Sequence, residues 1–173
     1  MKKLNRAIAY LSLGSNVGNR AQNLSDAIHL LQTENIHPVE ASSIYETSAW
    51  GLRDQHDFLN QVLKVETSLK AEELLQVILD TELKMGRKRT IKYGPRVIDI
   101  DILFYNSMII NKKGLTLPHP HLHKRNFVLY PLAEIAPGLL HPVLHKTSIE
   151  LLQMSEDELK VNIFIPPATT TEK

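Results

Sequence analysis

Cysteine is absent from the 173 residues of the sequence. Its absence excludes a disulfide scaffold, thiol catalysis and a zinc site with cysteine ligands. It also agrees with a reducing compartment, so we expect a cytoplasmic protein. A chain of this length can bury a substantial core without a disulfide or a structural metal. We therefore expect a single domain over residues 1–165 and a flexible tail at 166–173.

Long apolar runs and an excess of charge of one sign are missing as well. The N-terminal residues reach Gly14-Ser15-Asn16 before an apolar stretch of signal-peptide length develops, and no segment approaches the roughly 18 apolar residues of a membrane span. Lysine and arginine number 20 and aspartate and glutamate 19, which gives a net charge of +1. A general nucleic-acid binder carries a larger positive field. We therefore expect neither a membrane nor a nucleic acid as partner, and the sequence suggests no obligate protein partner.

The sequence also lacks the common phosphate-binding motifs: the Walker glycine loop, the glycine loop of protein kinases and the dinucleotide fingerprint. A glycine turn, Gly14-Ser15-Asn16-Val17-Gly18, follows the first apolar run. Such a turn can approach a phosphate, and it serves equally well as a plain connection between a strand and a helix. A nucleotide, if one binds, would need a phosphate-binding segment of another kind.

What the sequence does contain is an orderly series of strand and helix patterns. Apolar runs of strand type fall at 7–13, 39–47, 58–67 and 97–105, and apolar residues at helical spacing fall at 24–31 and 71–85. The order strand, helix, strand, strand, helix, strand is that of the ferredoxin-like βαββαβ fold. We therefore predict an α+β domain with a mainly antiparallel sheet and helices packed on it. Additional C-terminal elements would include a short strand at 108–110 and a short helix at 126–135.

Two carboxylates, Asp99 and Asp101, alternate with isoleucines in the last predicted strand. Side chains alternate between the faces of a strand, so these two share one face while Ile98, Ile100 and Ile102 share the other. Their Cα atoms would lie roughly 6.6 Å apart, where two negative charges repel unless a cation lies between them. Magnesium is the natural cation, because carboxylates and substrate phosphates are its usual ligands. The alternative is the ordinary solvated face of an edge strand.

A strongly basic segment precedes these carboxylates. The residues between Leu83 and Ile98 include six basic and no acidic side chains: Lys84, Arg87, Lys88, Arg89, Lys92 and Arg96. A cationic loop beside two carboxylates suggests a site that binds a polyanion together with its metal, as phosphoryl-transfer enzymes do. The alternative is a solvated basic loop with no such function.

Three histidines, His119, His121 and His123, recur at every second position and would suit a transition-metal cluster. Pro118 and Pro120 disturb the regular strand on which such a cluster would lie, and single histidines have many structural uses. A structural role is therefore the better interpretation of this pattern taken alone.

Three motifs together resemble the 6-hydroxymethyl-7,8-dihydropterin pyrophosphokinase family of folate biosynthesis. They are Leu13-Gly14-Ser15-Asn16-Val17-Gly18, Tyr93-Gly94-Pro95-Arg96-Val97-Ile98-Asp99-Ile100-Asp101-Ile102-Leu103 and Leu117-Pro118-His119-Pro120. The resemblance runs from Ala7 to Ile135. It implies a ferredoxin-like α+β fold and a reaction in which pyrophosphate moves from ATP to the hydroxymethyl group of the pterin, leaving AMP. It also implies two Mg²⁺ ions that act together with ATP.

The resemblance further implies roles for individual residues. Asp99 and Asp101 would bind both magnesium ions, while Arg87 and Arg96 would be catalytic and would compensate charge on the oxygen that bridges the α and β phosphates. The implied ATP-binding residues are Arg89, Lys92, Ile102, His119 and Arg125. The implied pterin-binding residues are Thr47, Ser48, Trp50, Phe58, Asn60 and Phe127.

The sequence departs from the family pattern near the basic segment. Tyr93 stands where many members have tryptophan, Lys92 stands where arginine is common, and the loop between Arg89 and Tyr93 is one residue shorter. Pro120 replaces an aromatic residue found in some relatives. These changes leave an anion-binding loop intact, but a lysine cannot offer the bidentate geometry of a guanidinium group, so the exact ATP contacts of this loop need not be those of the family.

Two other functions fit parts of the pattern. A metal-dependent phosphoesterase or nuclease would use the same carboxylates and basic loop to activate water. A nucleic-acid-binding module on a ferredoxin-like sheet would need the aromatic-rich RNP1 pattern, which the sequence lacks. Pyrophosphoryl transfer is the function that we expect.

Overall fold

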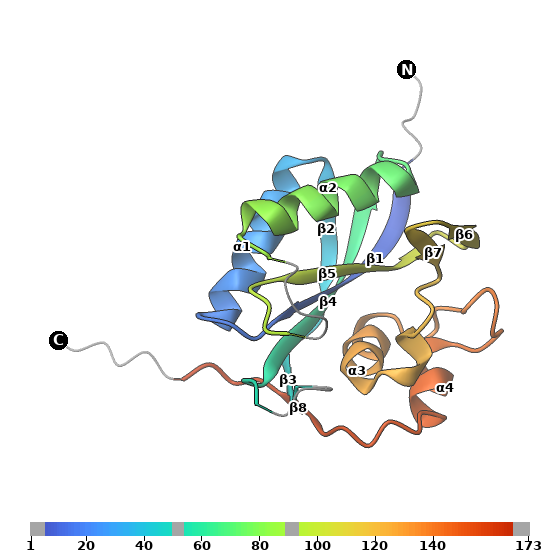
Figure 1. Ribbon diagram of the computed structural model, residues 1–173. Helices are drawn as coiled ribbons and strands as arrows, with labels where there is room; N and C mark the ends of the chain where they lie inside the picture. Colours follow the sequence, from blue (N-terminus) through green and yellow to red (C-terminus); the bar gives the residue numbers. More distant parts are fainter. Residues whose placement is uncertain (1–5, 50–53, 89–93, 168–173) are drawn as a thin grey trace.

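The computed structural model describes residues 6–49, 54–88 and 94–167. Up to Tyr105 the strands and helices follow one another in the predicted order, with one strand more than predicted, and smaller elements follow (Figure 1). In order they are β1 (Ala7–Ser15), α1 (Arg20–Thr33), β2 (Ile36–Ala41), β3 (Tyr45–Thr47), β4 (Phe58–Thr67), α2 (Ala71–Lys84), β5 (Asp99–Tyr105), β6 (Ile110–Lys112), β7 (Leu115–Leu117), the 3-10 helix η1 (Leu122–Lys124), α3 (Asn126–Ile135), α4 (Ser148–Gln153) and β8 (Val161–Ile163).

A six-stranded sheet forms the centre of the protein. Its order is β5-β1-β4-β3-β8, and β2 also pairs with β4. β1 lies between β4 and β5 and pairs antiparallel with both. β6 and β7 form a separate hairpin, which lies at one end of the molecule (Figure 1). The prediction of a mixed α and β protein with a mainly antiparallel sheet and packed helices is confirmed.

The prediction of one strand over residues 39–47 is wrong. The segment forms parts of two strands, β2 and β3, which pair with successive parts of β4. Ser42 lies between them: its N–H donates to the Val62 carbonyl at 2.9 Å, and its Oγ accepts the Val62 N–H at 3.0 Å. Within β2 the register shifts between Pro38 and Glu40, where proline offers no N–H to the ladder.

Helices α1 and α2 cover one face of the sheet (Figure 1). Each has 14 residues, and none of the helices in the described parts of the chain is long and apolar enough to cross a membrane. The Asn19 side chain caps α1 by accepting the Gln22 N–H at 3.1 Å. The buried side chains of both helices recur at helical spacing and pack against β1 and β5 in one core: Leu24, Ala27, Leu31, Leu74 and Ile78 meet Ala9, Leu11, Leu13, Ile100 and Ile102.

The other face of the sheet carries α3 and α4. A bulge in β5 changes which side chains of this strand point to each face. Between Tyr10 and Leu11 the partner on β5 shifts from Phe104 to Ile102, so Leu103 is an extra residue. Ile102 packs beneath α1 and α2, whereas Leu103 and Phe104 both belong to the core beneath α3 and α4. The bulge therefore separates the carboxylate-bearing part of β5 from the part that packs against α3.

The predicted alternation before this bulge is confirmed. Ile98, Ile100 and Ile102 belong to the core beneath α1 and α2. Because neighbouring side chains on a strand point to opposite faces, Asp99 and Asp101 project to the face that carries α3. Both carboxylates thus stand on the same side of the sheet.

After α4 the chain returns to the far edge of the sheet. β8 pairs with β3, and the Phe164 N–H donates to the Ile44 carbonyl at 2.8 Å just beyond the strand. β7, η1, α4 and β8 are all short and have no counterpart among the predicted elements. Residues 168–173 of the expected tail lie outside the described residues, so the domain boundary at 165 stays a prediction.

Candidate active site

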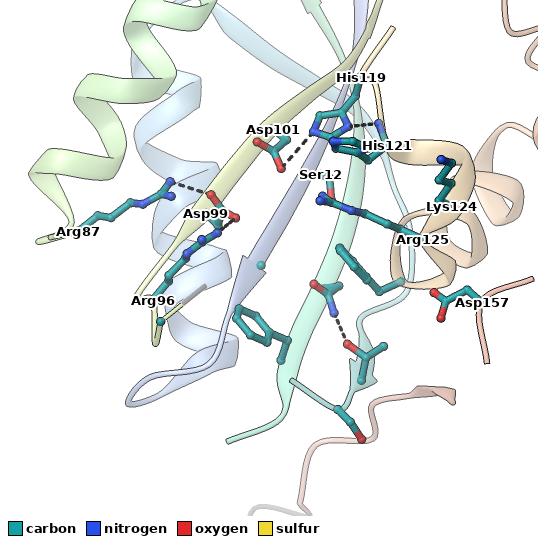
Figure 2. A pocket seen from close by; sticks show the side chains of 17 residues that line it. Ser12, Arg87, Arg96, Asp99, Asp101, His119, His121, Lys124, Arg125 and Asp157 are labelled. Atoms are coloured by element: carbon teal, nitrogen blue, oxygen red, sulfur yellow. Dashed lines mark hydrogen bonds and ion pairs between the residues drawn. The ribbon is translucent and has the colours of Figure 1, made fainter. Parts of the chain in front are cut away.

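A pocket of about 490 Å³ opens on the α3 side of the sheet. Figure 2 shows β5 on one side of it, η1 and the start of α3 on the other, and β1 and β4 between them. Most of the residues to which the sequence analysis gave roles line this pocket: Thr47, Ser48, Phe58, Asn60, Arg87, Arg96, Asp99, Asp101, His119, Arg125 and Phe127. Segments far apart in the sequence therefore bring the predicted metal, ATP and pterin residues to one cavity.

The remaining predicted residues are placed differently. Ile102 lies in the core beneath α1 and α2, so its side chain faces away from the pocket and an ATP contact would have to come from its backbone. Trp50, Arg89 and Lys92 lie outside the described residues. Their roles stay predictions.

Two arginines bind Asp99, the first residue of β5. Arg96 Nη1 donates to Asp99 Oδ2 at 2.5 Å, and Arg87 Nη1 lies 2.7 Å from Asp99 Oδ1. Gly14 stands opposite Asp99 on β1, and a Cβ at this glycine would approach Asn60 Oδ1 to 3.1 Å. Because Gly14 has no side chain, the floor of the pocket stays open between the Asp99 carboxylate and the Asn60 amide.

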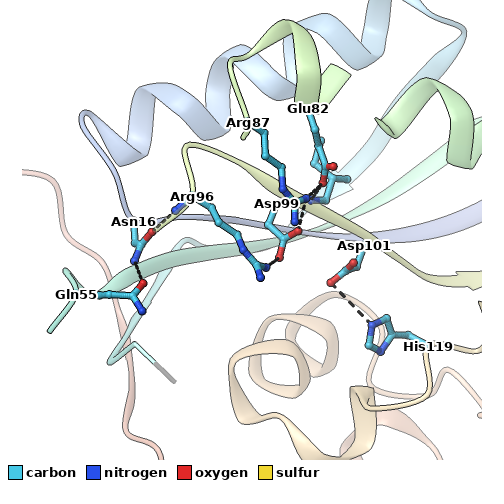
Figure 3. Close-up of polar contacts among 9 residues, drawn as sticks. Asn16, Gln55, Glu82, Arg87, Arg96, Asp99, Asp101 and His119 are labelled. Carbon is cyan, nitrogen blue, oxygen red and sulfur yellow. Dashed lines mark hydrogen bonds and ion pairs between the residues drawn. The ribbon is translucent and has the colours of Figure 1, made fainter. Parts of the chain in front are cut away.

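Arg87 also pairs with Glu82, a residue of α2 that the sequence analysis did not single out (Figure 3). Glu82 is 2% exposed, and its Oε1 accepts the Ile100 N–H at 2.8 Å. Burial raises the pKa of Glu82, while the Ile100 hydrogen bond and the Arg87 charge oppose that rise. Glu82 thus joins α2, the basic segment and β5 at one point. Its sequence signal is an acid four residues after buried Ile78, on the buried stripe of the helix.

The glycine turn after β1 braces the loop that carries Arg96. The Asn16 N–H donates to the Arg96 carbonyl at 3.1 Å, and Asn16 Oδ1 accepts the Arg96 N–H at 2.8 Å. Asn16 Nδ2 donates to Gln55 Oε1 at 3.0 Å and to the His56 carbonyl at 3.2 Å (Figure 3). Of the two alternatives for this turn, phosphate binding and structural connection, these bonds support the structural one.

Asp101 and His119 face each other in the pocket, with Oδ2 and Nε2 3.9 Å apart (Figure 2). Burial and, next, the charge of Asp99 raise the pKa of Asp101 to about 7. Burial and, next, the charge of Arg125 lower the pKa of His119 to about 4, so His119 is neutral at neutral pH. Its Nδ1 accepts the His121 N–H at 3.1 Å, which puts the ring proton on Nε2, the atom nearer Asp101.

Asp99 and Asp101 are the donors that a metal ion would meet in this pocket. Two neighbouring carboxylates disfavour each other's charge, as the raised pKa of Asp101 reflects, and a hard cation would compensate them. In the described ranges, no group of three or more histidine, cysteine, aspartate or glutamate side chains is arranged to hold a metal ion. A cation bound here would therefore take its other ligands from substrate and water, as Mg²⁺ usually does.

The residues predicted to bind the pterin meet where β3, β4 and α3 approach one another. Asn60 and Thr47 are 4% and 3% exposed, and Asn60 Nδ2 donates to Thr47 Oγ1 at 2.8 Å. This bond orients the amide and leaves its oxygen as an acceptor. Phe58 and Phe127 supply aromatic surface, and the Arg125 guanidinium lies 5.7 Å from the centre of the Phe127 ring. Aromatic walls beside an oriented amide suit a flat polar heterocycle.

Further residues line the pocket without having been assigned to it: Ser12, Gly14, Gly94, His121, Lys124 and Asp157. Ser12 stands opposite Asp101 on β1. Lys124 could have been suspected, because it adjoins Arg125 in a basic stretch. Asp157 follows every motif by more than thirty residues and has no local signal.

Comparisons with known proteins identify the family of this chain. The profile of the 7,8-dihydro-6-hydroxymethylpterin-pyrophosphokinase (HPPK) family matches residues 10–137. The 2-amino-4-hydroxy-6-hydroxymethyldihydropteridine pyrophosphokinase of Aquifex aeolicus is 49% identical over 140 residues, which are 81% of this chain and 87% of that protein. The folic acid synthesis protein FOL1 of Dictyostelium discoideum is 42% identical over 165 residues. These residues are 95% of this chain, which spans only 25% of that longer relative.

The fold is shared with solved structures as well. A crystal structure of a Plasmodium falciparum HPPK-DHPS variant with pterin and p-hydroxybenzoate matches with a TM-score of 0.71 and 20% identity, over 88% of this chain and 44% of that chain. At this identity the likeness concerns the fold alone. The family profile and the Aquifex aeolicus relative each cover most of the chain. This chain belongs to the 7,8-dihydro-6-hydroxymethylpterin-pyrophosphokinase family.

Proposed function

We propose that this chain transfers pyrophosphate from ATP to the hydroxymethyl group of 6-hydroxymethyl-7,8-dihydropterin and releases AMP, as a step of folate biosynthesis. One observation carries the proposal: a single pocket contains Asp99 and Asp101 with their arginines and also the Thr47–Asn60 pair with its aromatic neighbours. Membership of the pyrophosphokinase family supports the same reaction.

Asp99 and Asp101 would hold the two magnesium ions that we expect to act with ATP. Their fit rests on two hard oxygen donors on one strand face and on the mutual repulsion that a cation would relieve. Bound Mg²⁺ supplies positive charge that polarises phosphoryl oxygens. Asp99 and Asp101 would hold this charge beside Arg87 and Arg96.

Arg87 and Arg96 contribute fixed positive charge beside the carboxylates. Both guanidinium groups bind Asp99, and phosphate oxygens offer them the same kind of charge-assisted bond. Negative charge develops on the oxygen between the α and β phosphorus atoms as AMP leaves. An arginine at that oxygen stabilises the transition state, because its charge is in place before the reaction.

His119 and Arg125 form the expected nucleotide side of the pocket. Arg89, Lys92 and the backbone of Ile102 stay predicted ATP contacts. Neutral His119 presents Nε2–H as a donor for a phosphate oxygen. Arg125 adds a guanidinium group that can bind a phosphate oxygen. The two side chains line the pocket on the side opposite β5 (Figure 2).

The pterin would lie against Asn60 and Thr47, with Phe58 and Phe127 on its flat faces and Ser48 beside it, while Trp50 stays a predicted contact. This arrangement would direct the hydroxymethyl oxygen at the β-phosphorus for an in-line attack. The new bond joins that oxygen to the β-phosphorus while the bond to the bridging oxygen breaks, the hydroxyl proton is released, and AMP departs.

We also infer that the sheet contains a ferredoxin-like βαββαβ core. The order β1, α1, β2 with β3, β4, α2 and β5 supports this inference. So does the sheet order, in which β1 and β4 are central and β5 flanks β1 while β2 and β3 flank β4. β8, α3 and α4 are additions to that core.

The products formed from ATP test the proposed function. AMP should appear only when Mg²⁺ and 6-hydroxymethyl-7,8-dihydropterin are both present, and it should match the pyrophosphorylated pterin in amount. ADP as the product would refute pyrophosphoryl transfer. Release of inorganic phosphate without the pterin would instead indicate a phosphoesterase.

A further inference from the structure

Helix α3 begins without a cap from its own segment. Arg125 precedes its first turn, makes no side-chain capping bond and has extended backbone angles, φ −132° and ψ 103°. Helices favour serine, threonine, aspartate or asparagine at this position, because their oxygens accept the free N–H groups of the first turn. The start of α3 therefore depends on an acceptor from elsewhere.

Asp157 supplies this acceptor from the segment that follows α4. Its Oδ2 accepts the Asn126 N–H at 2.7 Å, and its carbonyl accepts a bond from Asn126 Nδ2, also at 2.7 Å. Asp157 Oδ1 accepts the Leu159 N–H at 3.0 Å, which orients the carboxylate. A negative charge also suits the positive end of the helix dipole. The two bonds to Asn126 fasten the C-terminal segment to the first residue of α3.

The residues on either side of Asn126 are those that face the pocket. Arg125 and Phe127 both line it, and Asn126 between them is 8% exposed. Asp157 lines the pocket too, and Figure 2 shows it on the same side as Arg125 and Lys124. The residue at which α3 starts determines the directions of its neighbours' side chains. A contact that fixes Asn126 can therefore also fix the directions of Arg125 and Phe127.

We propose that Asp157 is a positioning residue: by capping α3 at Asn126, it holds Arg125 toward the nucleotide and Phe127 toward the pterin. The proposal rests on the function proposed above for those two side chains. Asp157 lies outside the residues 10–137 that the family profile matches, so its role follows from the contacts of this chain. The C-terminal segment thereby becomes part of the active site.

Steady-state kinetics of Asp157→Ala test the proposal, with Glu156→Gln and Glu158→Gln as matched controls on its exposed neighbours. Loss of the cap should raise the KM values for ATP and for the pterin about tenfold. The kcat should change much less, because Arg125 and Phe127 bind the substrates and the transition state alike. Both controls should keep the wild-type KM values.

Amide hydrogen exchange of the substrate-free protein distinguishes positioning from other roles. In Asp157→Ala, the amides at the start of α3, Asn126–Leu129, should exchange faster, while those of α1 should not change. Raised KM values with unchanged exchange would overturn the proposal, because Asp157 would then act on a substrate directly. Faster exchange with wild-type KM values would overturn it as well, because the cap would then be structural only.

Asp157→Asn carries the test if Asp157→Ala does not fold. Its amide keeps one acceptor oxygen and loses the charge, so both KM values should rise about threefold. Wild-type KM values in this variant would overturn the proposal. Wild-type enzyme assayed in parallel must form AMP; if it does not, the proposed function fails, whereas amide exchange still decides whether Asp157 caps α3.

Discussion

Asp99 and Asp101 share a strand face but differ in their immediate surroundings. Asp99 has two guanidinium groups within 2.7 Å, whereas Asp101 has the neutral His119 ring at 3.9 Å. Burial, together with the charge of Asp99, raises the pKa of Asp101 to about 7. Asp101 therefore keeps its proton through the acidic range, and a cation that binds there has to displace it.

At the scale of these residues, Asp101 and His119 should contribute in opposite directions to the pH dependence of stability. The pKa of Asp101 rises on folding from 3.8 to about 7. The contribution of Asp101 to the free energy of unfolding therefore decreases as pH rises through this range. The pKa of His119 falls on folding from 6.5 to about 4. Its contribution is therefore present above pH 6.5 and is lost as pH falls toward 4.

Asp101→Asn and His119→Gln should consequently change the pH profile in opposite senses. Without Asp101, stability should increase more steeply than in the wild type as pH rises from about 4 to about 7. Without His119, stability should increase less steeply than in the wild type, or should decrease, over the same interval. Urea unfolding in EDTA, followed by circular dichroism, measures these slopes. Identical slopes in the three proteins would contradict the effects that we assign to burial.

At the scale of elements, sequence patterns located the longer strands and helices and the short helix α3, but not the shortest elements. β1, β4, β5, α1 and α2 lie where apolar periodicity predicted them, because each buries one face along most of its length. α4 and β8 have six and three residues, too few for a recognisable period. β8 also depends on pairing with the edge of β3, and the division at Ser42 depends on β4.

The candidate site shows the same limit. Asp99, Asp101 and His119 lie in motifs, so the sequence predicted them and the structure brings them into one pocket. Glu82 and Asp157 act through contacts between elements: α2 with β5, and the C-terminal segment with α3. The position of Glu82 on the buried stripe of α2 indicates its burial but not its partners, and Asp157 has no local signal. These contacts exist only in the folded structure, where distant parts of the chain meet.

Glu82→Gln should weaken the connection between α2 and β5. Glutamine still offers an oxygen to the Ile100 N–H, but Arg87 loses a buried partner charge and keeps only part of its anchoring through Asp99. We expect the free energy of unfolding to fall by about 2 kcal/mol. The kcat should fall as well, because Arg87 would be held less firmly at the phosphates. Urea unfolding and steady-state kinetics measure the two effects.

Asp80→Asn is the matched control for this variant. Asp80 is exposed on the same helix, where it accepts a bond from Gln76. Its replacement should change the free energy of unfolding by less than about 0.5 kcal/mol and should not change kcat. A wild-type kcat in Glu82→Gln would show that Arg87 does not need this anchor.

At the scale of the whole molecule, the sheet lies between the core beneath α1 and α2 and the candidate active-site pocket. α1 and α2 pack on one face, while the pocket opens on the face that carries α3 (Figure 1).

The family predicted from three motifs is confirmed by the profile and by the relatives. The cytoplasmic location, the domain boundary and the magnesium ions stay predictions. The segment from α4 to β8 completes both the sheet edge and one pocket wall.

AMP formation by Asp99→Asn and Asp101→Asn, with Mg²⁺, ATP and the pterin present, tests most directly whether the carboxylate pair is the catalytic metal centre. Each variant should keep the wild-type circular dichroism spectrum and lose activity at least about a hundredfold. Asp26→Asn, on the exposed side of α1, should keep full activity. Undiminished AMP formation in either Asp99→Asn or Asp101→Asn would contradict the proposed centre.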